Sequence, residues 1–338
     1  MENNLQYQPN DFKSNQEVRW CPGCGDHAFL NALYKAMANL NIPKEEFVVV
    51  SGIGCSSRTP YYVNTYAFHG IHGRAAVIST GVKTANPKLC VWTVTGDGDA
   101  LAIGGNHFIH LIRRNLDINL ILLNNQIYGL TKGQYSPTSR EGQVTKTSPY
   151  GTVEPPFLPG DLVLGAQGKF FARSLDTNIK LQTEIFVEAA QFKGTSVVEV
   201  LQNCVIFNDG AYDILTDKDH REERQIFLKH GEKMLFGKDN KKGIVLDGFK
   251  LKVVTIGEDG YTIDDILTHD AKTSNPFIHM MLIGMKYPNY PVAFGVIRSV
   301  ETTTYEAKLE QQIADVKASS NIQCVDDLLN SGDTWIVE

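Results

Sequence analysis

Two short polar segments contain the residues most able to hold a magnesium diphosphate. Gly96-Asp97-Gly98-Asp99 follows one apolar run, and Asn124-Asn125 follows the next run along the chain. Glycines let the backbone approach a diphosphate closely, and a helix beginning near Asp99 would offer it free N–H groups. Mg2+ prefers hard oxygen ligands in octahedral geometry, which the Asp97 carboxylate, the Asn125 amide and the Ile127 carbonyl could supply. A pair of unrelated strand-end turns is the alternative.

Four cysteines form the second chemical signal. Cys21 and Cys24 make a CxxC pair in a tight turn, which alone fits zinc, a redox dithiol or half of an iron–sulfur site. Cys55 and Cys204 each follow a predicted strand, so in a parallel sheet both would lie at the same edge as Asp97. Four thiolates fit either a structural zinc ion or a 4Fe–4S cluster, and the spacing alone does not decide between them.

The other two cysteines are expected to lie elsewhere. Cys90 begins the predicted strand that ends near Asp97, and at about 3.3 Å per residue this places it roughly 23 Å away, at the opposite edge. A small buried hydrophobic role is the expectation for it. Cys324 lies in the C-terminal part of the chain.

The elements that must position these residues alternate between apolar runs and helical spacing. Continuous apolar runs that alternate with helices indicate an α/β fold with a doubly wound, mostly parallel sheet. Asp26 is expected to cap the first helix. The predicted strands are 47–51, 91–95, 118–123 and 195–201, and the predicted helices are 28–40, 74–85, 100–115 and 178–193.

The character of the sequence changes near residue 236. We expect one domain over residues 1–235, which carries every chemical motif, and a small α+β appendage over 236–338. Within the appendage the pattern predicts strands at 250–256 and 278–283 and an amphipathic helix at 304–317.

Composition excludes several classes of protein. The net charge of −6 argues against a nucleic-acid-binding chain. The polar N-terminal segment has no signal-peptide pattern, and no run approaches the ~18 apolar residues of a membrane span. We therefore expect a cytoplasmic protein, in which six cysteines are too few for a disulfide scaffold and a CxxC is metal-binding or redox-active.

The combined pattern of GDG and a following NN resembles the thiamine diphosphate fingerprint. Five phrases, in order, resemble the β subunit of two-subunit 2-oxoacid:ferredoxin oxidoreductases, with the 2-oxoglutarate type most similar. The resemblance covers roughly residues 16–210. The phrases are WCPGCG (20–25), SGIGCSSRTP (51–60), HGIHGRA (69–75), GDGDALAIGG (96–105) and NNQIYGLTKGQYSPTS (124–139).

The resemblance implies a set of site residues. Because the four cysteines would lie beside a thiamine site, a 4Fe–4S cluster is favoured over zinc. The cluster would be held by Cys21, Cys24, Cys55 and Cys204. Mg2+ would be held by Asp97, Asn125 and Ile127. The residues implied to touch thiamine diphosphate are Gly54, Cys55, Ser56, His72, Gly96, Asp97, Gly98, Asp99, Asn125, Gly129 and Leu130.

Substrate choice is expected to depend on a few further positions. Arg58 could pair bidentately with the distal carboxylate of 2-oxoglutarate, and Leu130 would shape the same pocket. Lys132 and Thr131 either face the substrate or belong to the loop surface. For His69 the sequence favours neither a structural nor a ligand-binding role.

The implied reaction converts 2-oxoglutarate, coenzyme A and two oxidised ferredoxins to succinyl-CoA, CO2 and two reduced ferredoxins, or runs in reverse. Thiamine enzymes need a carboxylate at the aminopyrimidine from a second nucleotide-like domain. This sequence shows one such domain. We therefore expect an α subunit to supply the glutamate, in a heterotetramer of two α and two β subunits.

Three other functions fit parts of the pattern. Pyruvate is the main alternative substrate within the same enzyme class. A non-redox thiamine-dependent decarboxylase subunit with structural zinc would keep the GDG and NN motifs and lose the cluster. A non-catalytic metal-binding scaffold would bind no thiamine diphosphate.

Overall fold

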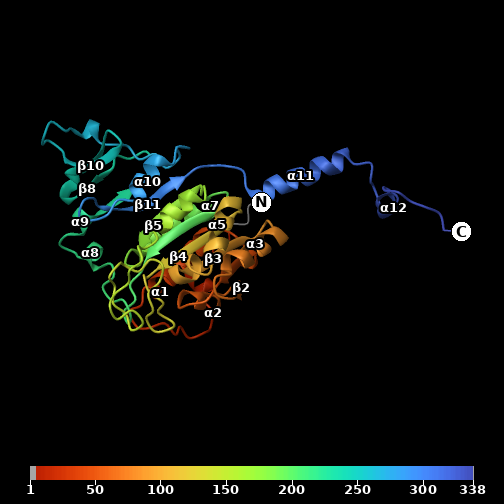
Figure 1. Cartoon of the computed structure of the whole chain (residues 1–338), viewed down its shortest axis with the longest axis horizontal. Coiled ribbons are helices and arrows are strands. Elements are labelled where there is room, and N and C mark those ends of the chain that lie inside the picture. The colour runs from red at the N-terminus through yellow and green to blue at the C-terminus, as the bar shows by residue number, and fades with distance from the viewer. Residues whose placement is uncertain (1–4, 338) are drawn as a thin grey trace.

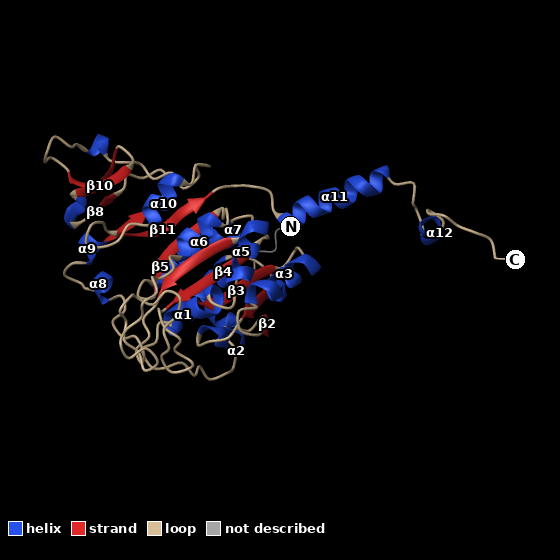
Figure 2. Ribbon diagram, in the orientation of Figure 1, coloured by secondary structure: helices blue, strands red, loops and turns tan. Residues whose placement is uncertain are grey.

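A mixed eight-stranded sheet forms the centre of the computed structural model, which describes residues 5–337 (Figures 1 and 2). The strand order is β2-β1-β3-β4-β6-β5-β11-β7, and every neighbouring pair is parallel except β5 and β11. The strands are β1 (Phe47–Ser51), β2 (Tyr66–His69), β3 (Cys90–Gly96), β4 (Ile118–Asn124), β5 (Phe170–Leu175), β6 (Ser196–Leu201), β7 (Gln225–Leu228) and β11 (Val292–Ser299).

Helices cover both faces of this sheet, so its central strands are buried along their whole length. The longer helices are α1 (Asp26–Asn39), α3 (Ala75–Ala85), α5 (Gly105–Arg114), α6 (Pro159–Gly165) and α7 (Ile179–Gln191). Alternate residues of one strand face opposite layers: Val49 packs in the core beneath α1 and α7, and Val48 and Val50 pack in the core beneath α5 and α6. The predicted doubly wound, mostly parallel fold is confirmed.

A few short helices and four strands of the main sheet, β2, β5, β7 and β11, were not predicted from the sequence pattern. The predicted helix at 100–115 is divided into α4 (Asp97–Leu101) and α5. Asp26 does not cap α1, because Gly25 holds that position and Asp26 lies buried in the first turn. The remaining short helices are α2 (Thr59–Tyr62), α8 (Asp213–Thr216) and α9 (Arg221–Arg224).

The sequence after residue 235 does not form one separate unit. A three-stranded antiparallel sheet is built from β8 (Leu235–Phe236), β9 (Lys242–Asp247) and β10 (Lys250–Thr255). The chain then returns to the main sheet, where β11 lies between β5 and β7. The predicted boundary at 235 therefore separates β11 from a sheet to which it is hydrogen-bonded.

The strand predicted at 278–283 is wrong, because this segment is helix α10 (Phe277–Ile283). The run is apolar apart from His279, and a short apolar run is ambiguous between strand and helix. The buried residues His279, Leu282 and Ile283 follow helical spacing, and Phe277 and Met280 are exposed. The preceding Pro276 also suits a helix start better than a strand.

The C-terminal residues form an arm that leaves the body of the protein (Figure 1). Helix α11 (Tyr305–Ser319), close to the predicted 304–317, is fastened only at its start, where the Asp117 N–H donates to Glu306 Oε1 at 2.8 Å. Short helix α12 (Val325–Leu329) follows, and Trp335 near the end is 82% exposed. No helix of the described residues has the length and apolarity needed to cross a bilayer.

A buried histidine joins α10 to β11. Arg298 Nη1 donates to His279 Nδ1 at 2.9 Å, and His279 Nε2 donates to the carbonyl of Asp270 at 2.9 Å. Burial is the main cause that lowers the pKa of His279 from 6.5 to about 4, and the charge of Arg298 lowers it further. The hydrogen bond to the Asp270 carbonyl opposes this shift. The folded protein therefore holds His279 neutral at pH 7.

We expect this histidine to make the fold less stable in acid. The folded pKa lies below the unfolded value, so the stabilisation is complete above pH 6.5 and is lost as the pH falls toward 4. The loss should reach about 1–3 kcal/mol. Urea unfolding at pH 7 and pH 4.5 measures it. His279→Asn, which retains an acceptor near the Nδ1 position, should show less of this pH dependence; an unchanged dependence would contradict the assignment.

Candidate functional site

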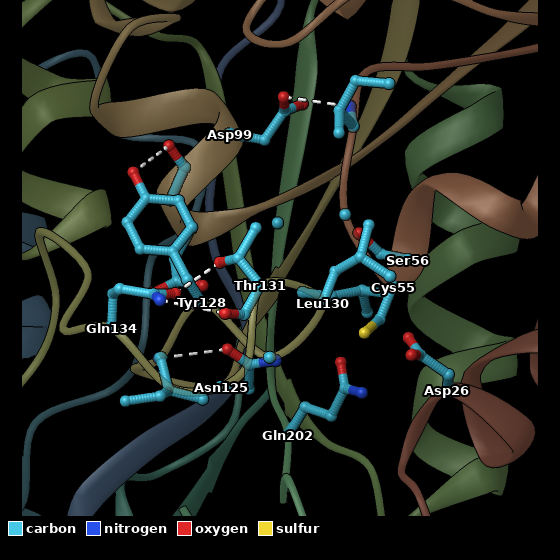
Figure 3. A pocket seen from close by; sticks show the side chains of 18 of the residues that line it. Asp26, Cys55, Ser56, Asp99, Asn125, Tyr128, Leu130, Thr131, Gln134 and Gln202 are labelled. Atoms are coloured by element: carbon cyan, nitrogen blue, oxygen red, sulfur yellow. Dashed lines mark hydrogen bonds between the residues drawn. The ribbon is translucent and has the colours of Figure 1, made fainter. Parts of the chain in front are cut away.

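A cavity of about 540 Å3 lies where β1, β3 and β4 end, at the carboxyl edge of the parallel sheet (Figure 3). Open α/β sheets bind ligands at this edge. Every residue that the sequence implied as a thiamine diphosphate contact lines this cavity, together with Ile127. The lining also includes Asp26, Ile53, Leu123, Tyr128, Thr131, Gln134 and Gln202.

The first polar wall is the turn between β3 and α4. Helix α4 starts directly at Asp97, whose Oδ2 accepts hydrogen bonds from Ser136 Oγ at 2.5 Å and Thr138 Oγ1 at 2.6 Å. Burial raises the pKa of Asp97, and these two hydroxyls oppose that shift. Ser136 and Thr138 come from the irregular segment after β4. No local pattern predicts that their hydroxyls turn back onto Asp97.

Asp99 fastens three segments together with one carboxylate. Its Oδ1 accepts from the N–H of Ile53 at 3.0 Å, the N–H of Gly73 at 2.7 Å and His72 Nδ1 at 2.7 Å. Its Oδ2 accepts from Thr95 Oγ1 at 2.7 Å. The side chain of Asp99 is therefore occupied by protein donors. Asp99 lines the cavity and positions the loops around it.

Two glycines keep space that a side chain would fill. A Cβ at Gly98 would overlap the ring of Tyr128, whose hydroxyl donates to the Gly98 carbonyl at 2.9 Å. A Cβ at Gly129 would lie 3.5 Å from Cys204 Sγ and 3.6 Å from Cys55 Sγ. The absence of a side chain at Gly129 thus leaves open space beside two sulfur atoms.

The CxxC turn lies next to the same space. Cys24 N donates to the Cys21 carbonyl at 3.1 Å, which closes the turn, and Gln202 Nε2 lies 3.6 Å from Cys24 Sγ. Burial raises the pKa of Cys55 to about 12, with smaller contributions from Asp26 and from neighbouring thiols. Among residues 5–337, no three His, Cys, Asp or Glu side chains are close enough to enclose a single metal ion.

Cys90 and Cys324 lie apart from this group, as the sequence predicted. Cys90 is the first residue of β3, at the opposite edge of the sheet from Asp97. Cys324 is exposed at the start of α12 in the C-terminal arm.

Asp26 is a cavity residue that the sequence analysis did not identify as part of the site. Its side chain is fully buried, Oδ2 accepts from Cys24 Sγ at 3.5 Å, and Oδ1 has no partner among the described residues. Burial raises the pKa of Asp26 to about 6. The signal available in the sequence was a carboxylate at the start of a helix that is mainly apolar. Because Asp26 was interpreted as a helix cap, it was not considered as a residue of the site.

Two residues predicted to meet the substrate lie outside the cavity wall. Arg58 Nη1 donates to the Arg19 carbonyl at 3.1 Å, and Lys132 is exposed in a left-handed turn with φ 78°. Neither residue lines the cavity, whereas Leu130 and Thr131 both do.

His69 and His72 have different environments. The exposed His69 on β2 interacts through Nδ1 with the Tyr61 hydroxyl at 2.9 Å. His72 lines the cavity and is held by Asp99, as described above. This arrangement leaves Nε2 of His72 as the ring nitrogen free to meet a ligand.

Loss of the Asp99 charge should destabilise the whole site. Asp99→Asn replaces one of two buried acceptor oxygens by an NH2 group, which would face a donor. We expect a loss of about 2–3 kcal/mol in the free energy of unfolding, measured by urea denaturation. Asp247→Asn, at an exposed position on β9, is the matched control and should change it by less than about 0.5 kcal/mol. Equal effects of the two substitutions would contradict the role of Asp99.

Comparisons with known proteins agree with the geometry of this edge. Residues 52–200 match the family model for the thiamine pyrophosphate enzyme, C-terminal TPP binding domain. The chain is 46% identical over 331 residues to 2-oxoglutarate oxidoreductase subunit KorB of Mycobacterium tuberculosis, covering 97% of this chain and 88% of that protein. It is 42% identical to 2-oxoacid:ferredoxin oxidoreductase 2, subunit beta, of Aeropyrum pernix, covering 66% and 70%.

A solved structure extends the likeness to the whole fold. The chain superposes on 2-oxoglutarate:ferredoxin oxidoreductase from Magnetococcus marinus with a TM-score of 0.79 and 30% identity, covering 98% of both chains. That structure contains 2-oxoglutarate, coenzyme A and succinyl-CoA. The resemblance predicted from the five sequence phrases is confirmed, and the chain belongs to the family of β subunits of 2-oxoacid:ferredoxin oxidoreductases.

Proposed function

We propose that this chain is the thiamine-diphosphate-binding subunit of a 2-oxoglutarate:ferredoxin oxidoreductase. The enzyme would convert 2-oxoglutarate, coenzyme A and oxidised ferredoxin to succinyl-CoA, CO2 and reduced ferredoxin, or run in reverse. One observation carries the proposal: the Asp97 turn, Asn125 and the sulfur-lined space beside Gly129 border a single cavity. The similarity to KorB and to a structure that contains 2-oxoglutarate supports this substrate over pyruvate.

The residues present fit a magnesium diphosphate. Ser136 and Thr138 hold Oδ2 of Asp97, and no donor among the described side chains is bonded to Oδ1, so that oxygen is the candidate ligand. Asn125 and the Ile127 carbonyl follow the neighbouring strand β4 and would complete the protein share of an octahedral Mg2+ site. Thiamine diphosphate, when bound, supplies the electron sink for decarboxylation.

His72 and the apolar wall would perform the remaining tasks. With Nδ1 held by Asp99, Nε2 of His72 can present a proton to a diphosphate oxygen. Ile53, Leu123 and Leu130 line the cavity with hydrocarbon, which excludes water from the reacting carbons and strengthens each electrostatic contact.

The sulfur atoms fit a cluster better than a zinc ion. A tetrahedral zinc site brings its four sulfurs to about 3.8 Å from one another, and no such closed group exists within residues 5–337. The space beside Gly129, bordered by Cys55 and Cys204, suits a larger group. We propose that these two cysteines and the CxxC pair, Cys21 and Cys24, hold a 4Fe–4S cluster that accepts single electrons.

A methyl group at Gly129 should block the cluster and leave the fold intact. The added Cβ meets both sulfurs only at ordinary contact distance, so Gly129→Ala should melt within about 2 °C of the parent chain. Iron and sulfide per chain after anaerobic reconstitution should fall several-fold. Gly105→Ala, whose Cβ would meet nothing within 4 Å, is the matched control. Full iron content in Gly129→Ala would argue against this cluster position.

A second subunit must complete the site. Within the described residues, the acidic groups that line the cavity are Asp26, Asp97 and Asp99, and no glutamate is among them. The rim carries exposed apolar side chains, including Ile53 at 36% and Leu130 at 42% exposure. We propose that an α subunit covers this rim and supplies the glutamate for the aminopyrimidine, in a heterotetramer of two α and two β subunits.

Substrate preference tests the assignment directly. The anaerobic complex with its α subunit, assayed with coenzyme A and a viologen acceptor, should show a kcat/KM for 2-oxoglutarate at least tenfold above that for pyruvate, about 1.4 kcal/mol in transition-state free energy. A preference for pyruvate would contradict the 2-oxoglutarate proposal.

The position of Arg58 makes a separate prediction with the same assay. Arg58 contacts the Arg19 carbonyl outside the cavity wall, so Arg58→Ala should change kcat/KM for both acids by the same factor. A loss confined to 2-oxoglutarate would show that this guanidinium pairs with the distal carboxylate.

A further inference from the structure

A second cavity, of about 250 Å3, lies at the same edge of the sheet, beside the ends of β4 and β6. Two buried residues, Asn124 and Thr138, line it and separate it from the first cavity. Thr138 Oγ1 lies 2.9 Å from Asn124 Oδ1 and 2.6 Å from Asp97 Oδ2, and its single proton is shared between these two acceptors. The two cavities are therefore adjacent but separate, and no described residue lines both of them.

The second cavity contains a buried guanidinium with unused donors. Arg173 on β5 is only 5% exposed, and its Nε donates to Glu199 Oε2 at 2.7 Å. Within the part of the chain that the structure describes, its two terminal nitrogens have no hydrogen-bond acceptor. A buried guanidinium is satisfied by further acceptors, and a carboxylate matches its geometry with two parallel hydrogen bonds.

Charge in this cavity is predominantly positive. Arg140 and Lys286 line it together with Arg173, whereas Glu199 is the one acidic side chain among the described lining residues. Glu199 is already used on both oxygens, because Oε1 accepts from Asn124 Nδ2 at 2.8 Å. Asp161 is close enough to interact electrostatically with Arg173 and Lys286 but does not line the cavity.

The remaining walls are mainly hydrocarbon, and the polar exceptions are the Gln126 amide and the Tyr212 hydroxyl. Phe157, Leu158, Leu201, Ile283, Met285 and Val292 line the cavity around the cationic end. A phosphate ion would seek donors on all sides, whereas a carboxylate on a short carbon chain would place its head at Arg173 and its chain against this wall.

We propose that this second cavity is a binding site for a small carboxylate, held by Arg173 with help from Arg140 and Lys286. The site does not depend on the proposed reaction, because none of these three residues lines the thiamine cavity. A carboxylate in the second cavity would contact Arg173. This residue is one end of a hydrogen-bonded series that continues through Glu199, Asn124 and Thr138 to Asp97 in the first cavity.

Lys286 is the residue to change first. It is exposed and has no hydrogen bond or ion pair from its side chain within the described residues, so Lys286→Gln should leave the fold intact. A neutral substitution of Arg173 would leave Glu199 buried without its partner and would destabilise the fold. Arg173→Lys keeps a positive charge beside Glu199 but loses the paired donors of the guanidinium, and it is therefore the second variant. Lys180→Gln, on the exposed face of α7, is the matched control for loss of one positive charge.

Titration of the full-length chain with succinate and with inorganic phosphate, at constant ionic strength and followed by ligand-observed NMR, tests the proposal. Saturating thiamine diphosphate and Mg2+ are present to occupy the first cavity. We expect succinate to bind and its Kd to rise about tenfold in Lys286→Gln, the equivalent of about 1.4 kcal/mol. The Kd should be unchanged in Lys180→Gln and raised in Arg173→Lys.

Three outcomes would overturn the proposal. Binding of phosphate without succinate would exclude a carboxylate site. Absence of binding by either anion up to about 20 mM, which corresponds to a binding free energy weaker than about −2.3 kcal/mol, would exclude a site. Equal weakening in Lys286→Gln and Lys180→Gln would assign the effect to overall charge. Each result concerns the second cavity alone, so failure here leaves the thiamine assignment standing.

Discussion

The carboxylate of Asp99 is the contact on which the site's shape depends. It accepts hydrogen bonds from the loop after β1, from the loop before α3 and from the end of β3, so three segments distant in sequence meet at one buried charge. A buried carboxylate is tolerated only when donors surround it. The same requirement fixes Gly52, because a Cβ there would overlap the Asp99 carboxylate, whereas a Cβ at Gly73 would overlap the backbone of Gly104.

A second buried polar series runs along the carboxyl edge of the sheet. Asp97, Thr138, Asn124, Glu199 and Arg173 are joined in that order by hydrogen bonds of 2.6–2.9 Å. In the protein interior the hydrogen bonds of such a network polarise and strengthen one another. It therefore holds the irregular segment after β4 against the sheet, and it gives the two cavities a common, rigid partition.

The sequence predicted those features that depend on local pattern. The strands around the first cavity were found because parallel strands buried on both faces are continuously apolar, and the shared edge of Asp97, Cys55 and Cys204 followed from strand direction. Features that depend on long-range pairing were missed. The return of β11 to the main sheet and the hydroxyl contacts of Ser136 and Thr138 arise from tertiary packing, which no local spacing encodes.

The C-terminal arm has a hydrodynamic consequence. Because α11 and the residues after it leave the body and add length with little mass, the subunit experiences more friction than a sphere of its 37.5 kDa. A column calibrated with compact standards would therefore assign the isolated monomer too large a mass. The molar mass from static light scattering does not depend on shape, so it is the appropriate measure of the number of chains in each particle.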